Sequence, residues 1–110
     1  MGLTKPSENR WFPRYHTVTC EYAVRLEAPG DALQARIVDV SRDGLGVLLG
    51  RGVEAGALYE FVLDGKRVKM QIVYCQRDLI HHGSWRAGLR RVGSAENLVG
   101  LFAAAKVIEP

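Results

Sequence analysis

The dipeptide Asp64-Gly65 limits the possible folds of this chain more than any other feature of its sequence. It lies between residues 58–63 and residues 66–74, two runs in which apolar and polar side chains alternate. Asp-Gly between alternating segments is the strongest short-range signal for a β-hairpin, because tight hairpin turns need residues that tolerate positive φ. The sequence therefore predicts two antiparallel strands joined by a tight turn at this point.

Four further segments are typical of β-strands. Apolar side chains alternate with polar ones over residues 17–26, which is the two-residue period of a half-buried strand. Aliphatic or β-branched runs occupy residues 34–40 and 45–49, and residues 85–92 are one more candidate strand. Together with the hairpin, these segments predict a mainly β chain that forms a small six-stranded antiparallel β-barrel, because closure removes exposed strand edges.

The last part of the chain has a helical period instead. Leu98, Leu101, Phe102 and Ala105 follow the spacing i, i+3, i+4 and i+7, so they share one face of an α-helix. Ser94 precedes this pattern and is a suitable N-cap residue. We therefore expect the barrel to be followed by one C-terminal α-helix.

Residues 1–14 differ from the rest of the chain because they are polar, contain Pro6 and Pro13, and show neither a strand nor a helix period. We expect them to form a flexible N-terminal arm. Residues 15–110 are then the barrel domain with its C-terminal helix. A chain of 110 residues has the usual length of one domain, so we expect a single core.

Composition and charge exclude several classes of protein. Hydrophobic residues make up 47% of the chain and the net charge is +3, which excludes both a disordered chain and a histone-like polycation. The first residues lack a signal-peptide core, and no apolar run approaches the roughly 20 residues needed to cross a bilayer. These observations predict a soluble, cytoplasmic protein.

No catalytic or metal-binding arrangement is recognisable in the sequence. Cys20 and Cys75 are far apart and lack CxxC spacing, so we expect two reduced, buried cysteines. His81 and His82 are adjacent, which points their side chains apart in an extended segment, and no third ligand is spaced near them. The chain also lacks a nucleophile elbow and a phosphate-binding glycine loop. We therefore predict a protein that is not an enzyme and has no metal or cofactor.

Two arginines mark the junction between the arm and the barrel. Arg10 and Arg14 lie four residues apart in the segment R-W-F-P-R, where Pro13 disfavours the α conformation at Phe12. Each guanidinium is a planar fork of donors that matches phosphate oxygens or the O6/N7 edge of guanine. On an extended or bent segment, the pair can reach different faces of one ligand. Taken alone, it is more typical of a solvated basic tail.

A second polar segment follows the strand predicted at residues 34–40. Asp39 and Ser41 point to the side opposite Val40, and Gly44 allows the backbone to turn sharply under them. A carboxylate beside a hydroxyl is a suitable acceptor set for the N1–H and N2–H donors of guanine. The alternative interpretation is that both side chains merely cap a turn by bonding local backbone.

Together the two segments resemble the signatures of the PilZ domain family, the bacterial receptor modules for the second messenger cyclic di-GMP. These signatures are an RxxxR motif at the N-terminal edge and a D/N-x-S-x-x-G motif on the barrel, and both are complete here. The likeness extends to G-L-G-V at residues 44–47, to the Gly56 turn and to W-R-A-G-L at residues 85–89, and so covers roughly residues 8 to 105. Arg91 is a departure, because the family often has an aromatic residue in this region.

The resemblance implies a role for each matching residue. Arg10 and Arg14 would wrap around the ligand and contact its phosphates and guanines. Asp39 and Ser41 would hold a guanine edge, while Gly44 would shape the turn. Further contacts with the ligand are expected from neighbouring positions, namely Asn9, Trp11, Arg42, Gly88 and Arg90.

The resemblance also implies a function, that of a non-enzymatic receptor or adaptor that binds cyclic di-GMP and signals by rearranging its N-terminal arm. The output would pass to a separate protein effector in motility, polysaccharide or regulatory pathways. Two alternatives remain open. One is an adaptor of the same fold that binds only protein. The other is a small basic barrel that binds single-stranded nucleic acid and stacks bases on its aromatic side chains, here Trp11, Phe12, Tyr74 and Trp85.

Overall fold

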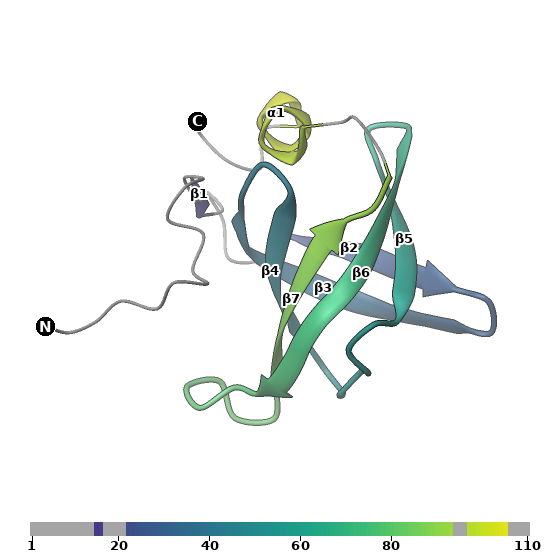
Figure 1. Ribbon diagram of the computed structural model, residues 1–110. Coiled ribbons are helices and arrows are strands. Elements are labelled where there is room, and N and C mark those ends of the chain that lie inside the picture. Colours follow the sequence, from purple (N-terminus) through teal and green to yellow (C-terminus); the bar gives the residue numbers. More distant parts are fainter. Residues whose placement is uncertain (1–14, 17–21, 94–96, 106–110) are drawn as a thin grey trace, which may run out of the picture.

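The computed structural model describes residues 15–16, 22–93 and 97–105, and it confirms a mainly β chain with one C-terminal helix. Figure 1 shows the strands wrapped into a barrel, with the helix lying across one end. The elements are β1 (Tyr15–His16), β2 (Ala23–Ala28), β3 (Asp31–Val40), β4 (Gly44–Leu49), β5 (Leu58–Leu63), β6 (Lys66–Arg77), β7 (Trp85–Arg91) and α1 (Leu98–Ala104).

Six of these strands close the barrel. They follow the order β3-β2-β5-β6-β7-β4 with antiparallel neighbours, and a further pairing between β3 and β4 completes the ring. The strands β2 and β5 meet at one registered pair, Glu27 opposite Glu60, whereas the other neighbours pair over most of their length. The predicted six-stranded antiparallel barrel is therefore confirmed.

The short strand β1 is an addition to the predicted elements. It pairs with the C-terminal end of β3, with Tyr15 opposite Val40 and His16 opposite Asp39. Because β4 occupies the other side of these β3 residues, β1 lies on the same edge of β3 as β2 does. Of the strand predicted at residues 17–26, β2 covers only the end, and residues 17–21 lie outside the described part of the chain.

The tight turns contain the positive φ angles that their residue types predict. Asp64 and Gly65 have φ values of 55° and 79°, as a two-residue hairpin turn with two positive φ angles requires, so the predicted hairpin is confirmed. A second tight turn, Pro29-Gly30, joins β2 to β3, and Gly30 has a φ of 75°. The strand β3 therefore begins at Asp31, earlier than the predicted residue 34.

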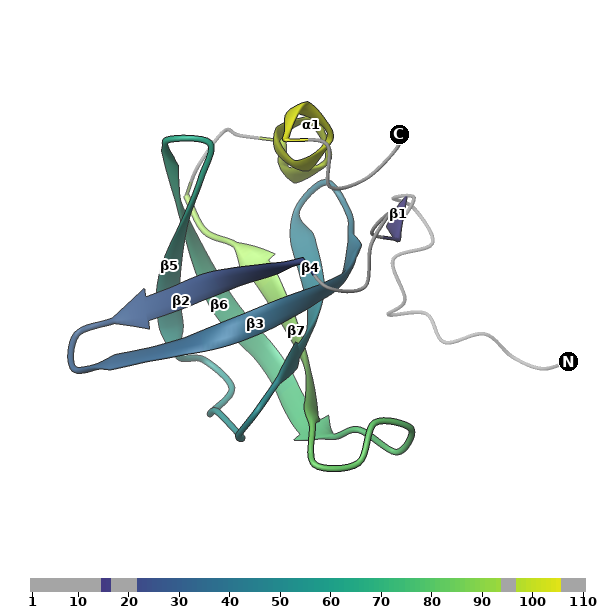
Figure 2. The same cartoon turned by 180° about the vertical axis from the view of Figure 1, so that it is seen from behind.

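The helix α1 covers one end of the barrel and completes its core (Figures 1 and 2). The ring of Phe102 is fully buried and lies 5.9 Å from the ring of Phe61 and 6.4 Å from that of Tyr22. Of the predicted helical face, Leu98 and Leu101 are buried beside Phe102, and Ala105 packs against the same core. The strands fill the interior with Val24, Leu26, Ala35, Ile37, Val40, Leu45, Val47, Leu49, Phe61, Val68, Met70, Ile72, Ala87 and Leu89.

The N-cap of α1 is Asn97, three residues later than the predicted cap. Its Oδ1 accepts hydrogen bonds from the backbone N–H groups of Val99 at 2.9 Å and Gly100 at 3.4 Å. An Asn at this position satisfies donors that the first helical turn leaves unpaired. Ser94, the predicted cap, lies outside the described residues. In the part of the chain that the structure describes, no helix is long and apolar enough to span a membrane.

Candidate ligand-binding site

A β-bulge sets the direction of Asp39. The register between β3 and β4 shifts between Ile37 and Asp39, so Val38 is an extra residue in β3. Ile37 and Val40 are both in the core, which strict alternation would not allow for residues three positions apart. The bulge therefore places Asp39 on the outer face of the barrel, opposite Gly46 of β4.

The carboxylate of Asp39 fills a space that only glycine leaves open. Asp39 is 7% exposed, and a Cβ atom on Gly46 would lie 2.8 Å from Oδ1 and 3.1 Å from Oδ2 of this carboxylate. The Nη2 atom of Arg86, on β7, lies 3.4 Å from Oδ2. Since Asp and Glu are rarely buried unless they are paired, the nearby guanidinium helps to explain how a carboxylate is kept at this position.

Ser41 begins the turn between β3 and β4. It is 3% exposed, and its backbone N–H donates to the carbonyl of Gly44 at 2.9 Å, while its Oγ approaches the same carbonyl at 3.4 Å. A Cβ on Gly44 would lie 2.9 Å from the carbonyl oxygen of Leu89. The absence of a side chain at Gly44 therefore allows the turn to lie against β7. The local hydrogen bonds support a turn-capping role for Ser41, and its hydroxyl has lone pairs for a second contact.

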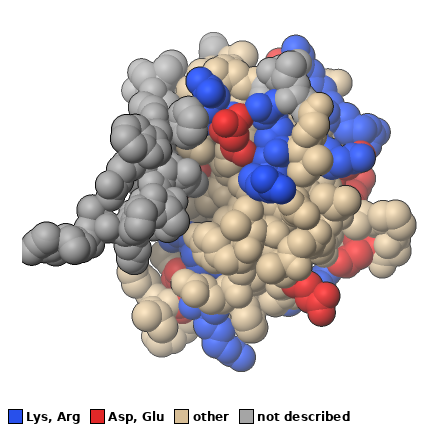
Figure 3. All heavy atoms as spheres, in the orientation of Figure 1, with Lys and Arg blue, Asp and Glu red and all other residues tan. Residues whose placement is uncertain are grey.

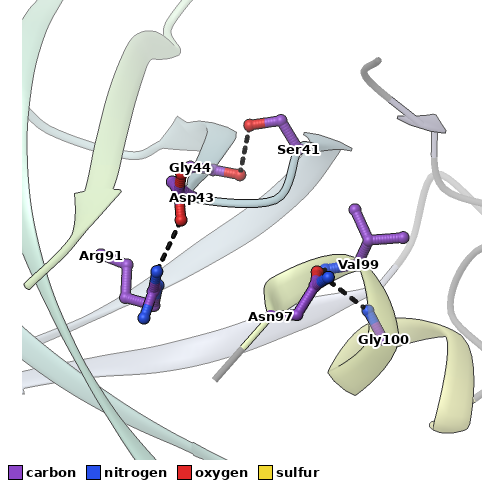
Figure 4. A network of polar contacts seen from close by, with 7 residues as sticks. All are labelled: Ser41, Asp43, Gly44, Arg91, Asn97, Val99 and Gly100. Atoms are coloured by element: carbon purple, nitrogen blue, oxygen red, sulfur yellow. Dashed lines mark hydrogen bonds and ion pairs between the residues drawn. The ribbon is translucent and has the colours of Figure 1, made fainter. Parts of the chain in front are cut away.

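Contacts from β7 and α1 hold the residues between Ser41 and Gly44, and Figure 4 shows the contact between Arg91 and Asp43. The Nη2 atom of Arg91, at the end of β7, donates to Oδ1 of Asp43 at 2.6 Å, and the Arg91 backbone N–H donates to the Asp43 carbonyl at 2.7 Å. The backbone N–H of Leu98, the first residue of α1, donates to the carbonyl of Arg42 at 3.1 Å. The turn is thus joined to both β7 and α1.

A second bulge, in β6, places an aromatic ring on the same outer face. The register between β6 and β7 shifts between Ile72 and Tyr74, and Tyr74 then lies opposite Gly88 with 44% of its surface exposed. A Cβ on Gly88 would lie 2.4 Å from Cε2 of Tyr74, so the ring covers this glycine. Two residues after Gly88 in β7, Arg90 is exposed and its Nε donates to Oε1 of Gln71 at 3.0 Å.

Charged side chains are unevenly distributed over the face of the molecule shown in Figure 3. Figure 3 shows Lys and Arg side chains gathered toward the end that carries α1, above a broad central area with few charged groups. A face of this kind can attract an anionic group at one end and leave uncharged surface for planar ring systems beside it.

The structure brings together part of the site predicted from the sequence. Asp39, Ser41 and Gly44 meet at the end of β3 and the start of β4, and Arg42 lies in the turn between them. The strand β1, which directly follows Arg14 in the chain, pairs with β3 at Asp39. The predicted arm over residues 1–14 lies outside the described residues. The predicted ligand contacts on this arm therefore lie outside them too, namely Asn9, Arg10, Trp11 and Arg14.

Sequence reasoning missed four groups around this site or assigned them no role in it. Gly46 appeared only within the G-L-G-V segment, and its position between the core residues Leu45 and Val47 was the signal that it faces outward. Arg86 appeared only within the W-R-A-G-L segment, and Tyr74 only as a candidate stacking ring for single-stranded nucleic acid. The ion pair between Arg91 and Asp43 has no local sequence signal, because the two residues are 48 positions apart.

The shifted pKa values of acidic groups in the described residues have structural causes. The backbone N–H and ring Nδ1 of His81 contact Oδ2 of Asp78 at 2.7 and 2.6 Å, and these hydrogen bonds lower the pKa of Asp78. The guanidinium of Arg51 and the hydroxyl of Tyr59 bind Asp31 and lower the pKa of that carboxyl. Among the described residues, no group of three or more His, Cys, Asp or Glu side chains could hold a metal ion.

The fold and these contacts define a class, that of small closed β-barrel domains in which a C-terminal helix covers one end. The model of the PilZ domain family matches residues 8–101, which is most of the chain, and the chain therefore belongs to the PilZ domain family. PilZ domains are, as a family, cyclic di-GMP-binding adaptor domains and are generally not enzymes. Comparison with curated proteins gives no match.

Proposed function

We propose that this chain is a receptor for cyclic di-GMP that has no catalytic activity and acts as an adaptor. One observation carries the proposal: the nearly buried acceptors Asp39 and Ser41 lie where β1, which follows the RxxxR motif, pairs with β3. Membership of the PilZ family supports the same ligand. The absence of a recognised catalytic set in the sequence supports a binding role rather than a chemical one.

Each group has a defined task in this proposal. The carboxylate of Asp39 accepts the N1–H and N2–H donors of a guanine, with the Ser41 hydroxyl beside it. The guanidinium groups of Arg10 and Arg14 bind the phosphates and the O6/N7 edges of the guanines. Binding rearranges residues 1–14 and changes the surface that a separate effector protein contacts. We propose that this occurs in the cytoplasm, with the effector belonging to a motility, polysaccharide or regulatory pathway.

Calorimetric titration with cyclic di-GMP tests the proposal. Arg10→Ala and Arg14→Ala should each nearly abolish binding, because every charge-assisted hydrogen bond contributes about 1.5 to 3 kcal/mol. Arg25→Ala is the matched control, since Arg25 is exposed and its Nε contacts Glu27 at 2.8 Å. Affinity within threefold of wild type in either motif variant would contradict the proposed binding mode.

A purine exchange tests the role of Asp39 separately. Replacing the guanines by hypoxanthine removes the N2 amine, so the inosine analogue of cyclic di-GMP should bind wild type more weakly. Asp39→Ala should weaken cyclic di-GMP binding and reduce the difference between the two ligands. Equal affinity of wild type for both ligands would rule out recognition of the N2 amine by this carboxylate.

Binding of single-stranded nucleic acid is the alternative, and the structure offers it less support. The guanidinium carbon of Arg77 lies 4.9 Å from the centre of the Trp85 ring, and Gly52 packs against the same ring. Trp85, one of the candidate rings for stacking nucleic-acid bases, therefore already has Arg77 and Gly52 against it. Titrations with an oligonucleotide and with GTP discriminate the two, because nucleic-acid binding would weaken steeply with salt. A protein-only adaptor would bind none of these ligands.

A further inference from the structure

Arg91 is a charged residue on the inner side of a core strand. The side chains of Leu89 and Ala87, two and four positions earlier in β7, lie in the core, so alternation directs Arg91 to the same side. The Arg91 side chain is 17% exposed, whereas that of its partner Asp43 is 43% exposed. Burying a guanidinium costs free energy unless it is paired. The presence of an arginine at this position therefore needs a structural reason.

The hydrogen bonds of Arg91 point to that reason. Its Nη2 and its backbone N–H both bind Asp43, at 2.6 and 2.7 Å. Its Nε and Nη1 are buried without a hydrogen-bond partner among the described residues. Within the described part of the chain, the Arg91 guanidinium is neutralised by Asp43, and through this ion pair it holds the turn that runs from Ser41 to Gly44.

We propose that Arg91 is a positioning residue for the ligand-binding turn, acting through its ion pair with Asp43. The pair holds the turn against the end of β7 and so keeps Ser41 and Asp39 in place before a ligand arrives. This inference rests on the proposed function, because the ligand whose affinity it controls is cyclic di-GMP. Arg91 itself needs no contact with the ligand.

The experiment is a double-mutant cycle on cyclic di-GMP affinity. Arg91→Met keeps most of the side-chain length and removes the charge, and Asp43→Asn removes the other charge. Each single variant should bind three- to tenfold more weakly, and the double variant should lose no more than the weaker-binding single variant, because both changes remove one interaction. Arg91→Lys, which keeps the cation, should retain more of the affinity than Arg91→Met.

A matched ion pair elsewhere on the barrel provides the control. Arg67 and Glu60 pair across β5 and β6 at 3.0 Å, and their side chains are more exposed than that of Arg91. Arg67→Met and Glu60→Gln should leave the affinity for cyclic di-GMP unchanged. A role for Arg91 in stability alone would lower the unfolding midpoint of Arg91→Met but leave the affinity of the folded protein within twofold of wild type, and that result would overturn the proposal.

Amide hydrogen exchange in the ligand-free protein separates this inference from the proposed function. The Ser41 and Leu98 amides both donate to carbonyls of the turn, so they should exchange several-fold faster in Arg91→Met than in wild type. Failure of wild type to bind cyclic di-GMP would refute the proposed function, and the exchange rates would still report on the turn. Unchanged exchange at both amides in Arg91→Met would show that the ion pair does not hold the turn.

Discussion

The substitution Gly46→Ala tests most directly whether the position of Asp39 determines ligand binding. The added methyl group would lie 2.8 to 3.1 Å from the three heavy atoms of the Asp39 carboxylate, which is closer than ordinary van der Waals contact. Gly46 does not have a positive φ, so the backbone itself accepts alanine. The carboxylate must therefore move, and its 3.4 Å contact with Arg86 must change with it.

The magnitudes follow from these contacts. Overpacking costs about 1 to 3 kcal/mol, and replacing glycine by alanine restores about 0.4 to 1 kcal/mol by restricting the unfolded chain. The free energy of unfolding should therefore fall by no more than about 2.5 kcal/mol, which most single domains survive. Losing one well-aligned hydrogen bond to a charged group costs about 1.5 to 3 kcal/mol, which weakens cyclic di-GMP binding about 10- to 150-fold.

Calorimetric titration and urea denaturation of the same samples measure both quantities. Gly50→Ala is the control, because a Cβ at Gly50 meets nothing within 4 Å and its φ is not positive. This control should leave both affinity and stability close to wild type. If Gly46→Ala were to bind cyclic di-GMP within twofold of wild type, the placement of Asp39 could not be what determines affinity, and the assigned acceptor role would be refuted.

Two further predictions concern stability. Asn97→Ala should lower the free energy of unfolding by about 1 kcal/mol in urea denaturation, because the Val99 and Gly100 amides lose their acceptor, and Asn97→Asp should not. Asp31 has a lowered pKa in the folded protein, chiefly through its hydrogen bond with Arg51, so its contribution is present above the unfolded value near 3.9 and is lost as pH falls through the lower folded value. Stability should fall less steeply below pH 4 in Asp31→Asn than in wild type; equal slopes would contradict this assignment.

Local sequence patterns predicted the parts of the fold that depend on local chemistry. The Asp64-Gly65 turn has the two positive φ angles that its residue types suggest, and the alternating residues Val68, Met70 and Ile72 are all in the core. Periodicity alone also identified the buried face of the C-terminal helix. These predictions succeeded because each depends on residues close together in the chain.

The features that sequence patterns could not predict depend on pairing between distant strands. Counting from Ile37 would point Asp39 inward, whereas counting from Val40 points it outward, and only the bulge at Val38 shows why both residues can be in the core. The burial of Asp39 and Ser41 arises from neighbours on other strands, and their polar residue types alone do not predict it. The ion pair between Arg91 and Asp43 joins residues that are 48 positions apart, so no local sequence pattern could indicate it.

The two parts of the proposed site carry different free-energy costs. Asp39 and Ser41 are already held by hydrogen bonds and by the close approach at Gly46, so these acceptors need little rearrangement when a ligand binds. In the proposed mechanism residues 10–14 become ordered on binding, which costs about 1 to 2 kcal/mol of backbone entropy per residue. Because each charge-assisted hydrogen bond contributes about 1.5 to 3 kcal/mol, the arginines gain only a small excess over this cost. The rigid acceptors must then supply much of the net affinity, and even a slight displacement of the turn should be measurable as weaker binding.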